Sequence, residues 1–174
     1  MAEPGVGEPG AGEPGLGEPG ARAPNLAMAR SPGSVLFCCT RNAIRSPMAE
    51  ALLKQLHGRR IYVDSVGVRP REVDPFAVAV MDELGLDISR HRAKAFADLE
   101  DTSFDLIVSL SPEAQHSAVE MTRTMACDVE FWPTLDPTAY EGSREIRLAA
   151  YREVRDSLLA RIRERFPPQT MPGG

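Results

Sequence analysis

Cys39 and Arg45 lie close together in a stretch that reads SVLFCCTRNAIRSPMAE, residues 34–50. A cysteine thiolate is a strong nucleophile, and an arginine guanidinium has a planar fork that can hold two oxygens of a phosphoryl group. Five residues separate the two side chains, so they can stand at the two ends of a short loop. The pair predicts a loop that wraps a phosphate-like anion, with Cys39 placed to attack it and Arg45 placed to clamp it.

The residues between them suit this chemistry. A loop that joins a strand to a helix turns consecutive backbone N–H groups toward one point, and the helix dipole adds a positive field that stabilises both an anion and a thiolate. Asn42 tolerates a left-handed backbone conformation, and the hydroxyl of Ser46 can hydrogen-bond the Cys39 sulfur. The residues expected to form the anion-binding loop are Thr40, Arg41, Asn42, Ala43, Ile44 and Ser46.

A purely structural interpretation of the two cysteines competes with this one. A cysteine and an arginine at this spacing also occur by chance, and a cysteine at the end of a core strand can be an ordinary buried residue. We assign that role to Cys38, which is expected to be the last residue of the strand. The anion loop is favoured for Cys39 because strand, loop, proline and helix follow in the required order.

The elements that must position this loop alternate along the chain. Apolar runs predict strands over residues 35–38, 61–66, 104–110 and 129–132. Helical spacing predicts one helix that begins at Pro47 and others over residues 75–84, 112–121 and 143–166. This order predicts a three-layer α/β fold, with a four-stranded parallel sheet, helices on both faces and the phosphate loop after the first strand. Ligands in such sheets bind at the carboxyl ends of the strands.

Composition divides the chain into one folded domain and two tails. Residues 1–30 contain the repeats EPGVG, EPGAG and EPGLG, which favour turns and offer little apolar surface, so a disordered tail is expected there. The folded domain is expected over residues 31–167, followed by a disordered C-terminus over residues 168–174.

Charge and cysteine content limit the partners and the compartment. The formal net charge is -5, and acidic and basic residues are interspersed, so neither nucleic acid nor a membrane surface is an expected partner. The odd cysteine count fits a reducing compartment, and the cytoplasm is expected. His57 and His116 have no metal-ligand spacing with a partner, so neither a metal nor another cofactor is expected.

The stretch VLFCCTRNAIRSPMAE resembles the signature of the low-molecular-weight protein tyrosine phosphatases and of the related thioredoxin-dependent arsenate reductases. The resemblance runs from about Ser34 to Phe166. It implies that Cys39 is the nucleophile, that Arg45 clamps the phosphate, and that Asn42 and Ser46 shape the loop. The residues that support this pair in the family match Ser65, in VDSVG, and His91, in SRHRAKA.

The resemblance also implies a general acid, an aspartate that precedes a proline. Asp74-Pro75 is best explained as a helix cap, because a helical pattern follows it. Asp136-Pro137 follows the fourth predicted strand, where the resemblance places the acid, so Asp136 is the candidate for the acid and then the base. A turn or cap role for Asp136 is the alternative.

Three functions remain open at this stage. The leading hypothesis is a cysteine-dependent phosphomonoester hydrolase, which acts on a phosphorylated protein or a small phosphoester. Phosphotyrosine is one candidate substrate, although the aromatic residue that these phosphatases place after Asp-Pro is absent and Tyr140 is the nearest substitute. Arsenate reduction would need an external thiol, because Ser111 and Ser117 stand roughly where the reductases have cysteines. A catalytically silent module that binds an oxyanion or a phosphopeptide is the third, since Arg41 replaces the usual glycine.

Overall fold

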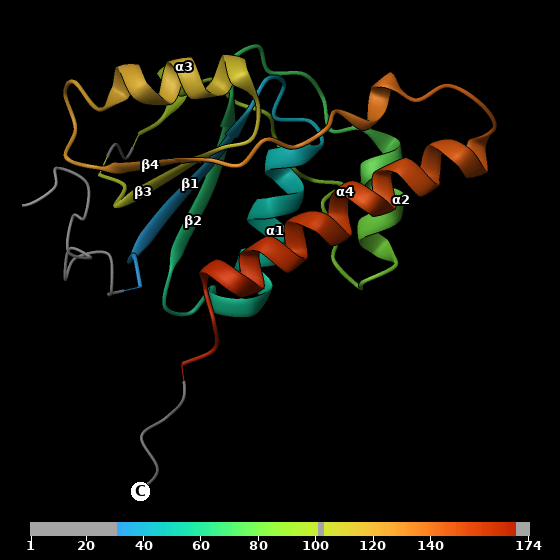
Figure 1. Ribbon diagram of the computed structural model, residues 1–174, viewed down its shortest axis with the longest axis horizontal. Helices are drawn as coiled ribbons and strands as arrows, with labels where there is room; N and C mark the ends of the chain where they lie inside the picture. Colours follow the sequence, from blue (N-terminus) through green and yellow to red (C-terminus); the bar gives the residue numbers. More distant parts are fainter. Residues whose placement is uncertain (1–30, 101–102, 170–174) are drawn as a thin grey trace, which may run out of the picture. The chain divides into compact units, whose positions relative to one another are not determined.

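Four short strands form one parallel sheet (Figure 1). In the computed structural model, which describes residues 31–100 and 103–169, the strands are β1 (Ser34–Cys39), β2 (Tyr62–Gly67), β3 (Leu106–Ser109) and β4 (Asp128–Phe131). Their order in the sheet is β2-β1-β3-β4, and every neighbouring pair is parallel. The predicted α/β fold with a four-stranded parallel sheet is confirmed, while the predicted tail over residues 1–30 lies outside the described residues, as do residues 170–174.

Four helices connect and cover the strands: α1 (Arg45–His57), α2 (Pro75–Asp82), α3 (Pro112–Met121) and α4 (Arg144–Arg165). Short 3₁₀ turns occur at Phe96–Asp98 and Pro137–Ala139. Helix α2 begins as predicted, because the Asp74 side chain accepts a hydrogen bond from the Phe76 N–H at 2.7 Å. Among the described residues, no helix combines the length and the apolar character needed to cross a bilayer.

Two predicted boundaries next to the phosphate loop are wrong. Helix α1 begins at Arg45 rather than at Pro47. A proline is tolerated throughout the first helical turn, where backbone N–H groups have no partner within the helix, so Pro47 does not mark the first position. Strand β1 ends at Cys39 rather than at Cys38. The nucleophile candidate is therefore held by the sheet itself at the last residue of β1.

The alternation of side chains along β1 separates the two cysteines. Val35, Phe37 and Cys39 belong to the apolar cluster that includes buried residues of α1, α2 and α4. Leu36 and Cys38 belong to the second cluster, on the α3 side of the sheet. Successive strand residues point to opposite faces, so only one of two adjacent cysteines can face α1 and the loop. That residue is Cys39.

Candidate active site

The loop between β1 and α1 folds back onto the Cys39 sulfur. Asn42 has a φ of 52°, the left-handed conformation that the sequence predicts for it. This turn brings the Asn42 backbone N–H to 3.2 Å from Cys39 Sγ. The Ser46 hydroxyl oxygen lies 2.9 Å from the same sulfur, on the first turn of α1. The loop thus directs one backbone donor and one side-chain hydroxyl at the thiol.

A chain of hydrogen bonds fixes the direction of these donors. The Ser65 hydroxyl donates its one hydrogen to Glu50 Oε1 at 2.6 Å. Ser65 is thus free to accept from Asn42 Nδ2, at 2.9 Å, and the same amide nitrogen donates to Ser46 Oγ at 2.8 Å. The Ser46 hydrogen then remains for one of two acceptors: Cys39 Sγ at 2.9 Å, when the sulfur is a thiolate, or the Val66 carbonyl oxygen at 3.4 Å. Through this chain, Glu50 leaves the Ser46 hydroxyl able to donate to a Cys39 thiolate.

The oxygen of the Asn42 side-chain amide is also fixed by hydrogen bonds. Asn42 Oδ1 accepts from the Lys94 backbone N–H at 3.1 Å, and His91 Nε2 lies 3.0 Å from it. The same His91 nitrogen lies 3.1 Å from the Asn42 carbonyl oxygen, so it must carry the proton. Burial lowers the pKa of His91 below its usual value, although Glu50 opposes this effect, so the ring is neutral at pH 7. The structure thus brings both predicted support residues, Ser65 and His91, onto Asn42.

Arg45 joins the loop to the segment that carries the candidate acid. The residue is only 8% exposed, and its guanidinium donates from Nη1 to the Thr134 carbonyl oxygen at 2.9 Å. Two residues further on, Asp136 caps the 3₁₀ turn at Pro137–Ala139 and accepts from the Thr138 N–H at 2.9 Å and from Thr138 Oγ1 at 2.7 Å. The candidate clamp and the candidate acid therefore lie on segments that touch.

The charge state of Asp136 follows from these neighbours. Burial raises the pKa of its carboxyl, but the two hydrogen bonds from Thr138, together with the charges of Arg45 and Arg41, outweigh burial and leave the pKa below its usual value. Arg41 itself is exposed, so its long side chain stands in solvent at the mouth of the loop. Asp136 is thus an ionised carboxylate near neutral pH in the absence of ligand.

The second Asp-Pro pair has a structural role. Asp74 Oδ1 caps α2, and Asp74 Oδ2 accepts a hydrogen bond from the Tyr151 hydroxyl at 2.9 Å. Its backbone N–H donates to the Ala43 carbonyl oxygen at 3.0 Å, which supports the loop from behind. Both carboxylate oxygens of Asp74 are therefore occupied by structural hydrogen bonds.

The remaining thiols are placed away from the loop. Cys38 is buried on the α3 face, and burial, followed by the neighbouring Cys39, raises its pKa well above the usual value. Cys127 packs, half-buried, against the same second apolar cluster, where burial also raises its pKa. The side chain that contacts the loop from α3 is a hydroxyl, because Thr40 Oγ1 donates to Ser111 Oγ at 3.0 Å. Within the described residues, no group of three His, Cys, Asp or Glu side chains could hold a metal ion.

Two residues in this arrangement were missed from the sequence. Glu50 closes the hydrogen-bond chain, and the only signal was its place at the end of the PMAE motif on α1. Gly67, at the end of β2, lies so close to the loop that a Cβ there would stand 2.7 Å from the Asn42 backbone nitrogen. Its place after VDSV gave no hint of that contact, which joins residues far apart in the sequence.

A parallel sheet with a cysteine and an arginine at the two ends of the loop after β1 defines a class of anion-handling α/β proteins. The sequence profile described as "Low molecular weight phosphotyrosine protein phosphatase" matches residues 34–167. The chain belongs to this family.

Relatives named for different activities resemble the chain to similar degrees. An arsenate reductase of Bacillus subtilis is 33% identical over 130 residues, which cover 75% of this chain and 92% of that protein. The structure of a low molecular weight protein tyrosine phosphatase from T. tengcongensis has a TM-score of 0.61 and 27% identity, with 73% of this chain and 92% of that one covered. An arginine phosphatase variant with a phosphorylated active-site serine has a TM-score of 0.60 and 25% identity, with 75% and 91% covered.

Proposed function

We propose that the protein is a cysteine-dependent phosphomonoester hydrolase, in which Cys39 is the nucleophile and Asp136 the general acid and base. The observation that carries this proposal is the hydrogen bond from Arg45 to Thr134, because it holds the clamp for the anion beside the segment of the candidate acid. Metal-free hydrolysis of a phosphoester needs a nucleophile, a group that binds the anion and a proton donor, all in contact with the same bound substrate.

In the first step, the Cys39 thiolate attacks phosphorus and the bond to the leaving oxygen breaks. Arg45 and the backbone N–H groups of residues 40–46 stabilise the charge on the non-bridging oxygens as the phosphoryl group transfers. Asp136, protonated in the complex, gives its proton to the leaving oxygen. The products of this step are an alcohol or phenol and a thiophosphate on Cys39.

In the second step, water attacks the phosphorus of the thiophosphate. The Asp136 carboxylate takes a proton from that water, and the sulfur–phosphorus bond breaks. The Ser46 hydroxyl, already 2.9 Å from Cys39 Sγ, donates to the departing thiolate and so eases the break. Inorganic phosphate leaves, and the enzyme returns to its starting state.

Arsenate reduction is the second candidate, and it is favoured by the similarity to the arsenate reductase of Bacillus subtilis. That reaction oxidises two thiols to a disulfide for each arsenate reduced, so Cys39 needs a thiol partner. In the described residues, the α3 side chain in contact with the loop is the hydroxyl of Ser111, and Cys38 is buried on the other face. An external thiol such as glutathione or mycothiol would have to supply the second sulfur, which makes hydrolysis the better-supported function.

The test is hydrolysis of p-nitrophenyl phosphate across pH without added metal, with wild type and Cys39→Ser compared. Turnover by wild type and none by Cys39→Ser is expected. A parallel assay measures arsenate-dependent loss of glutathione or mycothiol. Thiol loss without phosphoester hydrolysis would replace the proposal with arsenate reduction. Binding of phosphate or vanadate without either reaction would leave a silent oxyanion-binding module.

A further inference from the structure

A cleft of about 690 Å³ lies directly beside the phosphate loop. It separates the segment after β2, residues 70–73, from the segment at residues 89–93. Three exposed arginines line it: Arg71, Arg90 and Arg92. We call it the arginine cleft.

The arginine cleft is joined to the loop by hydrogen bonds from both of its walls. The Arg71 N–H donates to the Arg41 carbonyl oxygen at 2.9 Å, and His91 Nε2 donates to the Asn42 carbonyl oxygen at 3.1 Å. A phosphorylated residue bound in the loop would therefore place its chain neighbours near the cleft.

The charges of these three arginines are only partly balanced by acidic groups in the described part of the chain. Arg71, Arg90 and Arg92 form no ion pair there, whereas Arg69 next to them pairs with Glu113 at 3.0 Å. The nearby acidic groups are Glu72, which also lines the cleft, and Asp87, which interacts with Arg90. The cleft thus carries a positive excess in a chain whose net charge is -5.

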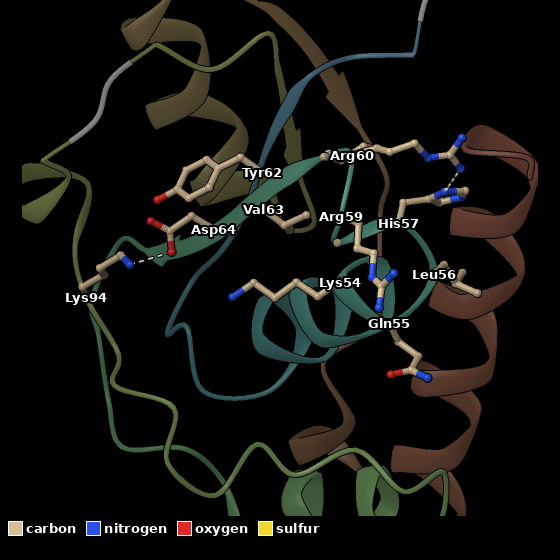
Figure 2. A pocket seen from close by; sticks show the side chains of 12 residues that line it. Lys54, Gln55, Leu56, His57, Arg59, Arg60, Tyr62, Val63, Asp64 and Lys94 are labelled. Carbon is tan, nitrogen blue, oxygen red and sulfur yellow. Dashed lines mark hydrogen bonds and ion pairs between the residues drawn. The ribbon is translucent and has the colours of Figure 1, made fainter. Parts of the chain in front are cut away.

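A second basic cleft, shown in Figure 2, is different in this respect. It is lined by the end of α1, the first part of β2 and Lys94, and both of its lysines are held in ion pairs. Lys94 pairs with Asp64 at 2.5 Å, Lys54 pairs with Glu50 at 2.7 Å, and Arg60 hydrogen-bonds to His57 at 3.0 Å. In the arginine cleft, by contrast, none of the three arginines is in an ion pair with a described residue.

We propose that the arginine cleft recognises acidic side chains that flank the phosphorylated residue, so that the substrate is a phosphoprotein with aspartate or glutamate near its phosphorylated site. This inference rests on the proposed hydrolase function. Arginine forks suit carboxylates, and complementary charge raises the association rate and selects among partners. Exposed ion pairs contribute little each, so the preference arises from several arginines together and is weakened by salt.

The test compares two phosphotyrosine peptides that differ only in whether the flanking residues are Glu or Gln. At low ionic strength, wild type is expected to hydrolyse the Glu peptide with a kcat/KM about tenfold higher. Arg71→Gln/Arg90→Gln/Arg92→Gln should lose most of this preference and retain its activity on p-nitrophenyl phosphate, which is too small to reach the cleft. Retained activity also shows that the variant is folded.

The matched control is Arg59→Gln/Arg123→Gln/Arg163→Gln, which removes the same charge from exposed positions elsewhere. It should keep the full preference. Three results would overturn the inference: equal rates for both peptides in wild type, a preference that survives in the cleft variant, or an equal loss of preference in the control. None of these results would contradict the hydrolase function as long as p-nitrophenyl phosphate is hydrolysed. If p-nitrophenyl phosphate is not hydrolysed, the hydrolase function fails. The cleft is then tested by fluorescence anisotropy, which measures the affinity of the two peptides for Cys39→Ala with and without the cleft substitutions. Tighter binding of the Glu peptide that is lost with the cleft substitutions would support the inference, and equal binding of the two peptides would overturn it.

Discussion

The guanidinium of Arg45 donates a hydrogen bond to the carbonyl oxygen of Thr134 at 2.9 Å, across 89 positions of the sequence. The bond uses one of the five guanidinium donors, so others remain for the oxygens of an anion. It also holds the segment of Asp136 at the mouth of the loop, where the charges of Arg45 and Arg41 help to lower the pKa of Asp136 against the effect of burial. In the proposed mechanism, this one side chain connects anion binding with proton transfer.

Asp136→Asn tests the proton transfer. We expect kcat for phenyl phosphate to fall by about 10²–10⁴-fold, because the phenoxide then leaves without a proton. The loss for p-nitrophenyl phosphate should be smaller, since nitrophenoxide is a better leaving group. The measurement is the ratio of kcat values for the two substrates, and Asp74→Asn, which can still cap α2, is the control. An equal loss with both substrates would remove Asp136 from the acid role.

The sequence predicted what is local in this site. Cys39, the loop and Arg45 follow one another along the chain, so strand, turn and helix signals place them together. The left-handed conformation of Asn42 and the cap formed by Asp74 are also local, and both are found. The exact start of α1 was mistaken because Pro47 fits several positions of a first turn.

The long-range contacts could not be predicted from periodicity. The Ser65 bond to Glu50 and the approach of Gly67 to Asn42 join β2 to α1 and to the loop, and no local pattern encodes them. Ser65 and His91 were selected only through the resemblance to a family, and the structure brings both onto Asn42. Whether these residues act in turnover stays a prediction.

The pH profile should respond to Thr138. Its two hydrogen bonds lower the pKa of Asp136, so Thr138→Val, which keeps only the backbone bond, raises that pKa. Asp136 must be protonated for the first step, so a higher pKa keeps the acid form to higher pH. The alkaline limb of kcat/KM for phenyl phosphate should therefore shift to higher pH. Arg41→Gln should shift it in the same direction by a smaller amount, and Arg41→Lys should not. A shift to lower pH in Thr138→Val would contradict this account.

Ser65→Ala tests the hydrogen-bond chain behind the thiol. The change leaves Glu50 Oε1 and one Asn42 amide hydrogen without their partner, which should lower the free energy of unfolding by about 1–3 kcal/mol. Urea denaturation measures the loss, with Ser157→Ala on the exposed face of α4 as the control. We also expect kcat to fall about tenfold, because the Ser46 hydroxyl is no longer oriented toward Cys39. An unchanged kcat together with a lowered free energy of unfolding would show that these hydrogen bonds have only a structural role.

Gly67→Ala tests how closely β2 supports the loop. A Cβ at this position would lie 2.7 Å from the Asn42 backbone nitrogen and 2.8 Å from the Arg41 carbonyl carbon, so the loop backbone must move. Such a displacement tilts the N–H groups away from the anion, and a loss of at least about 10²-fold in kcat/KM is expected. Gly33→Ala is the matched control, because its Cβ would meet only the end of the Asp105 side chain at 3.2 Å. Vanadate affinity, measured alongside kcat/KM, should fall in Gly67→Ala and not in Gly33→Ala. Unchanged vanadate binding in Gly67→Ala would mean that the loop accommodates the methyl group and that Gly67 does not set the shape of the loop.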